Sequence, residues 1–208
     1  MVIIPHPKNN KPLGVKMSGG VDSSILLYVL AKEFDNPLVP ITVDNYINPY
    51  QSTYTNKVID FVNNELNVSI PHTITDISSP EVDLDDVLTS LVQREVEKGT
   101  FDVYYMAQTK NPDPKLVDED HLHVIEDTFH RLPERDWGTP EEKLITGISY
   151  RPFINLHKGH IKELYDYHGV TDTLFPLTKS CETDGTPFTE HCGHCWWCVE
   201  RHWAFNKL

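Results

Sequence analysis

Apolar residues near the start of the chain form a short run that a helical stripe follows. Residues 13–17 are mostly apolar, as in a buried strand, and a glycine-containing turn comes directly after them. Beyond the turn, apolar residues recur at three- and four-residue spacing, which places them on one face of a helix. They are Leu26, Leu27, Leu30, Ala31 and Phe34. The pattern predicts a strand, a tight turn and a helix in direct succession.

Strand-like runs and helical stripes continue to alternate along the chain. Further strands are predicted over residues 38–43, 68–74, 101–107 and 145–148. The helical stripes are Val58, Phe61, Val62 and Leu66; Leu84, Leu88, Leu91, Val92 and Val96; and Ile161, Leu164, Tyr165 and His168, with Gly169 placed to end the last helix. Residues 111–140 break the pattern and are interpreted as a long loop near the active-site side. This order predicts an α/β fold in which a Rossmann-like parallel sheet carries helices on both faces.

Length and composition predict a single domain over residues 1–208, with a metal-binding segment at about 180–208. The 208 residues are 39% apolar, which is enough for a sizeable core. No stretch approaches the ~20 apolar residues of a membrane span, and the first residues lack a leader pattern, so a cytoplasmic location is expected. The net charge of -13 argues against tRNA or DNA as a partner but not against ATP, because backbone amides and Mg²⁺ can hold phosphate.

The turn after the first strand has the composition of an anion site. Residues 18–24 read SGGVDSS and lie between a strand and a helix start, where amide groups and the helix dipole favour phosphate. An ordinary turn with a helix cap would explain the glycines but not the whole string. Asp22 can hold Mg²⁺ or cap the helix. The predicted nucleotide-binding residues are Met17, Ser18, Gly19, Gly20, Val21, Asp22, Ser23, Ser24 and Asp44.

This string is not a Walker sequence, because no Gly-Lys-Ser/Thr ends it. It resembles the SGGxDS signature of the PP-loop ATP-pyrophosphatase superfamily, whose fold is adenine nucleotide alpha hydrolase-like. The resemblance implies that the loop holds the departing pyrophosphate. Attack then occurs at the α-phosphate, and a substrate oxygen is activated as its adenylate.

The four cysteines gather near the end of the chain. They are Cys181, Cys192, Cys195 and Cys198, and the last three form two overlapping Cys-x-x-Cys steps. Four thiolates close a tetrahedral zinc shell, so Zn²⁺ is expected as a structural staple. An iron–sulfur cluster and a redox-active cysteine pair stay open as alternatives. The nearby His191, His194 and His202 are interpreted as solvated or as neighbours of the ligands rather than ligands.

The loop and the cysteine cluster together resemble the 7-cyano-7-deazaguanine synthase family, and the resemblance implies a divergent member of it. Two further segments match: residues 151–161 with Leu164 and residues 168–170, and Lys179-Ser180-Cys181 with Arg201 and residues 204–205 after the last cysteine. The resemblance implies an ATP-dependent carbon–nitrogen ligase that adenylates 7-carboxy-7-deazaguanine, forms the amide with ammonia, and dehydrates it to the nitrile. It also implies Asp22 and Lys158 as catalytic residues. Lys158 would clamp phosphate, although a solvated lysine at a helix start is the alternative.

The match is weakest in the middle of the chain, where substrate contacts are expected. Residues 44–50 and 107–112 differ from the family pattern, so Tyr46, Gln108 and Asn111 are the candidate substrate-binding residues. Two other functions stay open. One is another PP-loop adenylating enzyme, either tRNA-thiolating or amide-forming, and the other is a non-catalytic module that binds ATP and zinc. The sequence also leaves a homodimer open.

Overall fold

The structure is a computed structural model that describes residues 4, 9–47, 49–112, 141–143, 148–181 and 190–208. Most of the loop predicted at residues 111–140, and residues 145–147 of a predicted strand, lie outside the described residues. In chain order the elements are β1 (Leu13–Lys16), α1 (Val21–Glu33), β2 (Leu38–Asp44), α2 (Gln51–Leu66), β3 (Ile74–Ile77), α3 (Leu84–Glu97), β4 (Val103–Tyr105), β5 (Glu141–Lys143), β6 (Ile148–Tyr150), α5 (Lys158–His168), the short helix η3 (Phe175–Leu177) and α6 (Trp196–Phe205).

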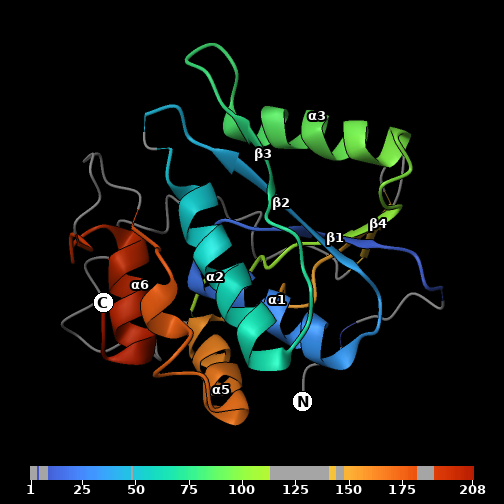
Figure 1. Ribbon diagram of the computed structural model, residues 1–208. Helices are drawn as coiled ribbons and strands as arrows, with labels where there is room; N and C mark the ends of the chain where they lie inside the picture. The colour runs from blue at the N-terminus through green and yellow to red at the C-terminus, as the bar shows by residue number, and fades with distance from the viewer. Residues whose placement is uncertain (1–3, 5–8, 48, 113–140, 144–147, 182–189) are drawn as a thin grey trace.

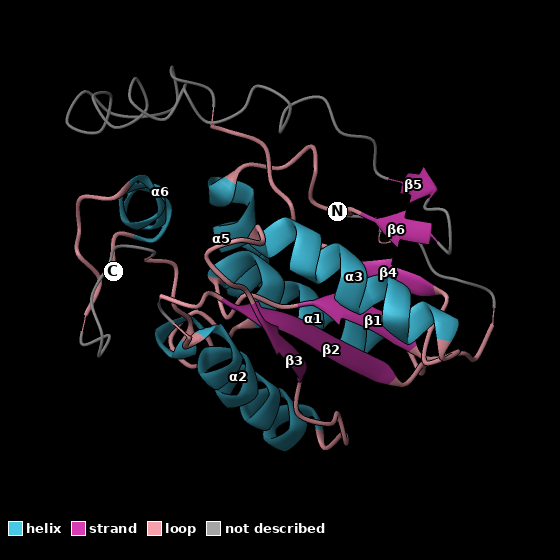
Figure 2. Ribbon diagram, turned by 90° about the horizontal axis from the view of Figure 1, so that it is seen from above, coloured by secondary structure: helices cyan, strands magenta, loops and turns pink. Residues whose placement is uncertain are grey.

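The described strands form one sheet in the order β3-β2-β1-β4-β6-β5. All neighbours pair in parallel except β5, which runs antiparallel to β6 at the edge. The helix α3 covers one face, and α1, α2 and α5 cover the other (Figures 1 and 2). The predicted Rossmann-like α/β fold is therefore confirmed. The chain leaves β1 toward β2 on one side, and β4 lies on its other side, so the strand order reverses at the end of β1.

Two apolar clusters, one on each side of the sheet, form the core. The larger joins β1 and α1 to α2, α5 and the end of α6, and the smaller lies between the sheet and α3. Alternation along β1 supplies both, because Leu13 and Val15 enter the larger cluster while Gly14 faces the other way. A β-carbon on Gly14 would lie 2.8 Å from the Phe101 ring and from Cβ of Tyr104. The glycine thus lets these two rings pack directly on the central strand.

The helix α1 is the most deeply embedded helix of the larger cluster. Every residue from 23 to 30 is buried, because the sheet, α2 and α5 surround it. Its first turn, which follows β1 directly, is consequently held by packing along the whole helix.

The strand after α2 and the last helix differ from the sequence prediction, and neither β5 nor η3 was predicted. The strand predicted at residues 68–74 begins only at Ile74, because Asn67 ends α2 in the left-handed region and the Asn63 amide bonds both the N–H and the C=O of Ile70. Ile70 is buried without joining the sheet, and this burial explains the strand-like signal. The helix α6 was not predicted, since its cysteines were read only as metal ligands. The end of α5 at Gly169, with φ +70°, is as predicted.

Candidate nucleotide site and cysteine cluster

The turn between β1 and α1 is fixed by a close approach to α2. Gly19 has φ +71°, and a β-carbon there would lie 2.6 Å from Cβ of Tyr54 and 3.2 Å from the Gln51 carbonyl oxygen. Its own carbonyl accepts a hydrogen bond of 2.8 Å from the Lys179 amide. Only glycine combines this backbone angle with this lack of space. The turn is therefore held between the start of α2 and the segment that leads to the cysteines.

The serines of the turn bind its own backbone. Ser24 donates through Oγ to the Gly20 carbonyl at 2.7 Å, and Ser23 does so at 3.2 Å. Gly20 opens α1 without a side-chain cap. By helix geometry, the first amides of α1 have no carbonyl four residues before them within the helix. The Gly20 amide donates to Ser18 Oγ at 3.3 Å, and the amides of residues 21–23 lie at the start of α1, a place where an anion is stabilised.

Met17 is the last residue before the turn, and its side chain is buried in the larger core cluster. Its amide donates to the Ile41 carbonyl at 2.8 Å, which extends the pairing of β1 with β2. Met17 therefore positions the turn through its backbone, whereas its predicted contact with nucleotide stays a prediction.

Asp22 forms an ion pair with Lys158, which opens α5 far along the chain. The neighbouring His157 caps α5 by accepting a hydrogen bond of 3.1 Å from the Gly159 amide. Only 8% of the Lys158 side chain is exposed, so the alternative of a solvated lysine at a helix start is wrong. Asp22 does not cap α1, and its buried Oδ1 has no hydrogen-bond partner among the described residues. The structure thus brings together the two predicted catalytic side chains.

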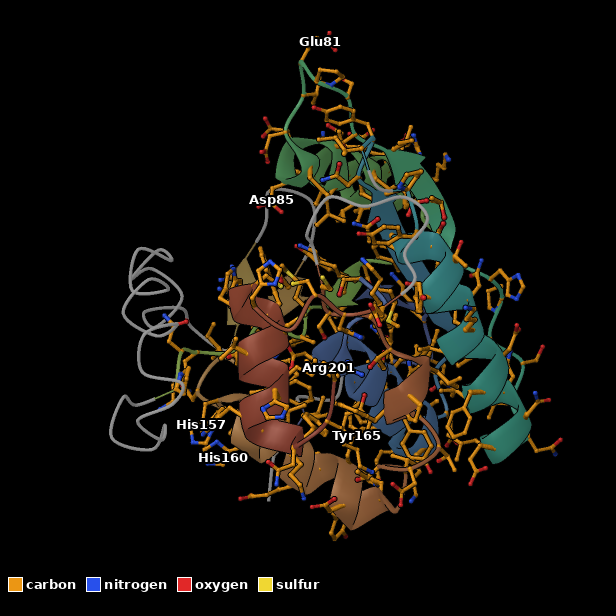
Figure 3. The ribbon with its side chains drawn as sticks, turned by 90° about the vertical axis from the view of Figure 1, so that its left-hand side faces the viewer. Glu81, Asp85, His157, His160, Tyr165 and Arg201 are labelled. Carbon is orange, nitrogen blue, oxygen red and sulfur yellow. The ribbon has the colours of Figure 1, made fainter. Side chains whose placement is uncertain are left out.

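Tyr165 and Arg201, both labelled in Figure 3, are buried side chains of α5 and α6 close to the turn. Tyr165 of α5 donates its hydroxyl to the Val21 carbonyl at 2.9 Å, and burial raises the pKa of this phenol. Arg201 of α6 donates to Thr178 Oγ1 at 2.7 Å and stacks on the Phe175 ring. Burial, the largest effect, lowers the pKa of Arg201 to about 10, where the side chain is still cationic at neutral pH. The interior near the turn therefore holds the positive charge of Arg201 at neutral pH.

Lys179 connects the turn to the first cysteine. Its amide bonds Gly19, and its ammonium donates to the Cys181 carbonyl at 2.5 Å and lies 3.1 Å from the centroid of the Tyr50 ring. Sequence patterns indicated no role for Lys179 beyond its place in a family match. Its buried contacts could not be anticipated, because nothing in the spacing indicates that residue 179 returns to residue 19.

Asp44 lies at the carboxyl end of β2, beside the turn after β1. Its two carboxylate oxygens accept hydrogen bonds from the amide and hydroxyl of Ser52, at 2.8 and 2.6 Å, and these bonds anchor the start of α2. Tyr46 follows it, is 43% exposed, and donates its amide to Ser78 Oγ. The position at the strand end is compatible with the predicted nucleotide contact, which stays a prediction.

Gln108 and Asn111 follow β4, on the other side of β1. The side chain of Arg151 donates a hydrogen bond of 3.5 Å to the side-chain Oε1 of Gln108, and the Lys110 amide donates to the Leu156 carbonyl at 2.9 Å. The segment after β4 is thus tied to the segment before α5. Since β1 and β4 flank the point where the strand order reverses, both residues lie on the side of the sheet where a ligand is expected.

The four cysteine sulfurs come together in one group, with all Sγ atoms within 4.8 Å of one another. Cys192 and Cys198 lie 3.9 Å apart, and Cys181 and Cys195 lie 4.0 Å apart. Cys195 caps α6 and donates its amide to the Cys192 sulfur at 3.3 Å. A hydrogen bond with Cys195, and then burial, raises the pKa of the Cys198 thiol. The group could therefore hold a metal ion.

The neighbouring histidines lie outside the group of four sulfurs. His191 accepts a hydrogen bond from the Ser180 amide at 3.3 Å, and His194 contacts the Cys192 carbonyl. Burial, followed by the charges of Arg201 and Lys179, lowers the pKa of His191 to about 4, so its ring is neutral and can accept this bond. His202 is exposed on α6.

Known proteins resemble this chain only distantly. The chain matches no family model, and no curated protein is significantly similar in sequence. Among solved structures, the U34-tRNA thiolase NcsA from Methanococcus maripaludis, with its [4Fe-4S] cluster, has a TM-score of 0.47 and 14% identity over 93% of this chain. The NMN synthetase from Francisella tularensis has a TM-score of 0.40 and 14% identity over 97% of this chain and 79% of that one. The chain spans 64% of the length of the thiolase. No helix of the described residues has the length and apolarity to cross a membrane.

Proposed function

We propose that this protein is a PP-loop ATP pyrophosphatase that activates a carboxylate as its adenylate and joins it to nitrogen. The observation that carries the proposal is the pairing of the SGGVDSS turn with Lys158. The turn presents helix-opening amides at the carboxyl end of β1, and a buried lysine from α5 reaches Asp22 in the same turn. A non-catalytic turn would not require a desolvated lysine beside it.

The parts suit departure of pyrophosphate. A carboxylate oxygen of the substrate attacks the α-phosphorus of ATP, and the bond to the bridging oxygen of the β-phosphate breaks. The released charge develops on pyrophosphate, where the amides of residues 21–23 and the Lys158 ammonium would stabilise it. Bound Mg²⁺ would neutralise phosphate charge, and the unpartnered Oδ1 of Asp22 is the oxygen suited to hold it. Ammonia then attacks the acyl carbon and AMP leaves.

The resemblance to the 7-cyano-7-deazaguanine synthase family suggests the substrate, 7-carboxy-7-deazaguanine. The contacts between its matching segments support it, although they are distant in sequence. The Lys179 amide bonds Gly19, and Arg201 donates to Ser180 Oγ at 3.3 Å. Under this proposal Asp44, Tyr46, Gln108 and Asn111 contact the nucleotide or the base. The partners are the acid and ammonia in the cytoplasm, and the net charge of -13 disfavours RNA.

Zinc is the metal that we propose for the cysteine group. A zinc–sulfur bond of about 2.3 Å places tetrahedral ligands roughly 3.8 Å apart. Two of the sulfur separations, 3.9 and 4.0 Å, are close to that value, and all four sulfurs lie within 4.8 Å of one another. An iron–sulfur cluster puts several irons between its thiolates and holds them further apart than one ion does. Four cysteines leave no open position, so the ion would be structural.

The test is an incubation of the protein with ATP, Mg²⁺, ammonia and 7-carboxy-7-deazaguanine, with products identified by mass. We expect AMP and pyrophosphate in equal amounts, and two ATP consumed for each nitrile. A product that stops at the amide would keep the ligase and change its end point. Pyrophosphate release that requires tRNA would favour a thiolating enzyme. ATP binding without pyrophosphate release for any acid would indicate a non-catalytic module and overturn the proposal.

A further inference from the structure

Glu200 brings a second carboxylate to the buried lysine of the nucleotide site. Its Oε2 lies 3.6 Å from the Lys158 ammonium, and 8% of each side chain is exposed. Glu200 belongs to α6, the helix that begins at Cys195. One residue from each of three helices therefore meets here: Asp22 from α1, Lys158 from α5 and Glu200 from α6.

The geometry explains why a second carboxylate matters. An ammonium group has three N–H donors on a flexible four-carbon chain, so one partner leaves its direction poorly defined. Asp22 accepts a hydrogen bond from the ammonium, and the Glu200 carboxylate, 3.6 Å away, attracts it by charge, so N–H donors remain for a phosphate oxygen. Arg201, the next residue, is also buried, so two carboxylates and two cations gather here, with Asp22 19% exposed and the other three more deeply buried. Balanced charges of this kind offset the free-energy cost of burying the Glu200 carboxyl group.

We propose that Glu200 is a positioning residue that holds the Lys158 ammonium toward the SGGVDSS turn. The proposal rests on the proposed role of Lys158 as a phosphate clamp. It assigns a second task to the cysteine group, because the ligands Cys195 and Cys198 fix the start of α6 and thereby fix Glu200. The metal staple and the nucleotide site are then mechanically connected through one side chain.

The first test measures the position of Lys158 without any catalytic assay. The zinc-loaded protein is treated briefly with acetic anhydride, and the acetylation rate of each lysine is read by peptide mass spectrometry. In Glu200→Gln we expect Lys158 to react about three- to tenfold faster, because its ammonium is held from one side only. Lys162, paired with Asp166 on the same helix, should not change. An exposed control, Glu163→Gln, should leave both rates as in the wild type.

The conservative variant Glu200→Asp keeps the charge and should restore most of the protection of Lys158. Equal acetylation of Lys158 in Glu200→Gln and the wild type would overturn the proposal. So would a uniform rise at all lysines of Glu200→Gln that Glu200→Asp does not reverse, since that result means general loosening.

The second test uses pyrophosphate release in a cycle with Lys158→Met. Glu200→Gln alone should lower kcat about tenfold with little change in the KM for ATP. In the Lys158→Met background the same change should have no further effect, because Glu200 acts through the lysine. Additive losses would overturn the proposal. If the wild type releases no pyrophosphate with any acid, the proposed function fails, and the acetylation result still decides the placement of Lys158.

Discussion

The close contact between Gly19 and α2 leads to a prediction whose size can be worked out. The substitution Gly19→Ala places a methyl group 2.6 Å from Cβ of Tyr54 and 3.2 Å from the Gln51 carbonyl, in a backbone conformation with φ +71°. Two separate costs arise, one from the backbone angle and one from the collision. The chain contains a control for the first, because Gly99 has φ +74° and no atom within 4 Å of the place where a β-carbon would lie.

The expected free energies follow from these two sites. An L-residue in the left-handed region costs about 1–2 kcal/mol. Forcing a carbon into a packed space costs about 1–3 kcal/mol more. Gly99→Ala should therefore lower the free energy of unfolding by about 1–2 kcal/mol, and Gly19→Ala by about 2–5 kcal/mol. The loss expected for Gly19→Ala is a large part of the whole free energy of unfolding, which is about 5–15 kcal/mol for a typical domain.

Urea unfolding followed by circular dichroism measures both costs, and equilibrium binding of Mg²⁺-ATP measures the effect on the turn. If the turn shifts to relieve the collision, Gly19→Ala should weaken ATP binding by about tenfold or more, whereas Gly99→Ala should not change it. Equal destabilisation by the two substitutions would show that the collision with α2 is absent. Unchanged ATP affinity in Gly19→Ala would refute the role of this turn in nucleotide binding.

Three further predictions follow from the described contacts. Cys195→Ser should abolish the expected one zinc per chain, measured by elemental analysis, and unfold α6, because structural zinc supplies folding energy directly. Tyr165→Phe should lower the free energy of unfolding by about 1 kcal/mol, measured by urea unfolding, through loss of the bond to the Val21 carbonyl. The Glu95 pKa is lowered from 4.5, first by the Lys98 ammonium. The stabilisation of the folded protein by ionised Glu95 should be complete above pH 4.5 and should vanish as pH falls through the lowered pKa. The urea midpoints of wild type and Glu95→Gln should therefore converge in acid.

The sequence was sufficient where structure is local. The strand, turn and first helix follow from a short apolar run, two glycines and a three- and four-residue stripe within about twenty residues. The ending of α5 at Gly169 follows in the same way from one residue able to adopt φ +70°. The grouping of the cysteines could also be predicted, because three of them lie close together in sequence. Cys195 caps α6, Cys198 lies in its first turn, and Cys192 lies three residues before the cap.

Prediction failed where long-range contacts override local preference. The apolar residues after α2 look like a strand, but the side chain of Asn63 satisfies the backbone of Ile70 instead of a neighbouring strand. Glu200 carries no signal in the sequence, since an isolated glutamate on a helix is usually solvated. Only the packing of α6 against α5 shows that it is buried beside Lys158.

The buried cations near the SGGVDSS turn come from the second half of the chain. Residues 18–24 supply amides, hydroxyls and Asp22, whereas the buried cations that offset negative charge are Lys158, Lys179 and Arg201. Two of these three lie on or beside the segment that the cysteines organise. If the cysteine group holds a metal ion as proposed, loss of that ion would leave the turn in place but release Arg201 and Glu200 from their fixed positions. Nucleotide affinity should then depend on metal occupancy, even though four thiolate ligands would leave no open position for substrate.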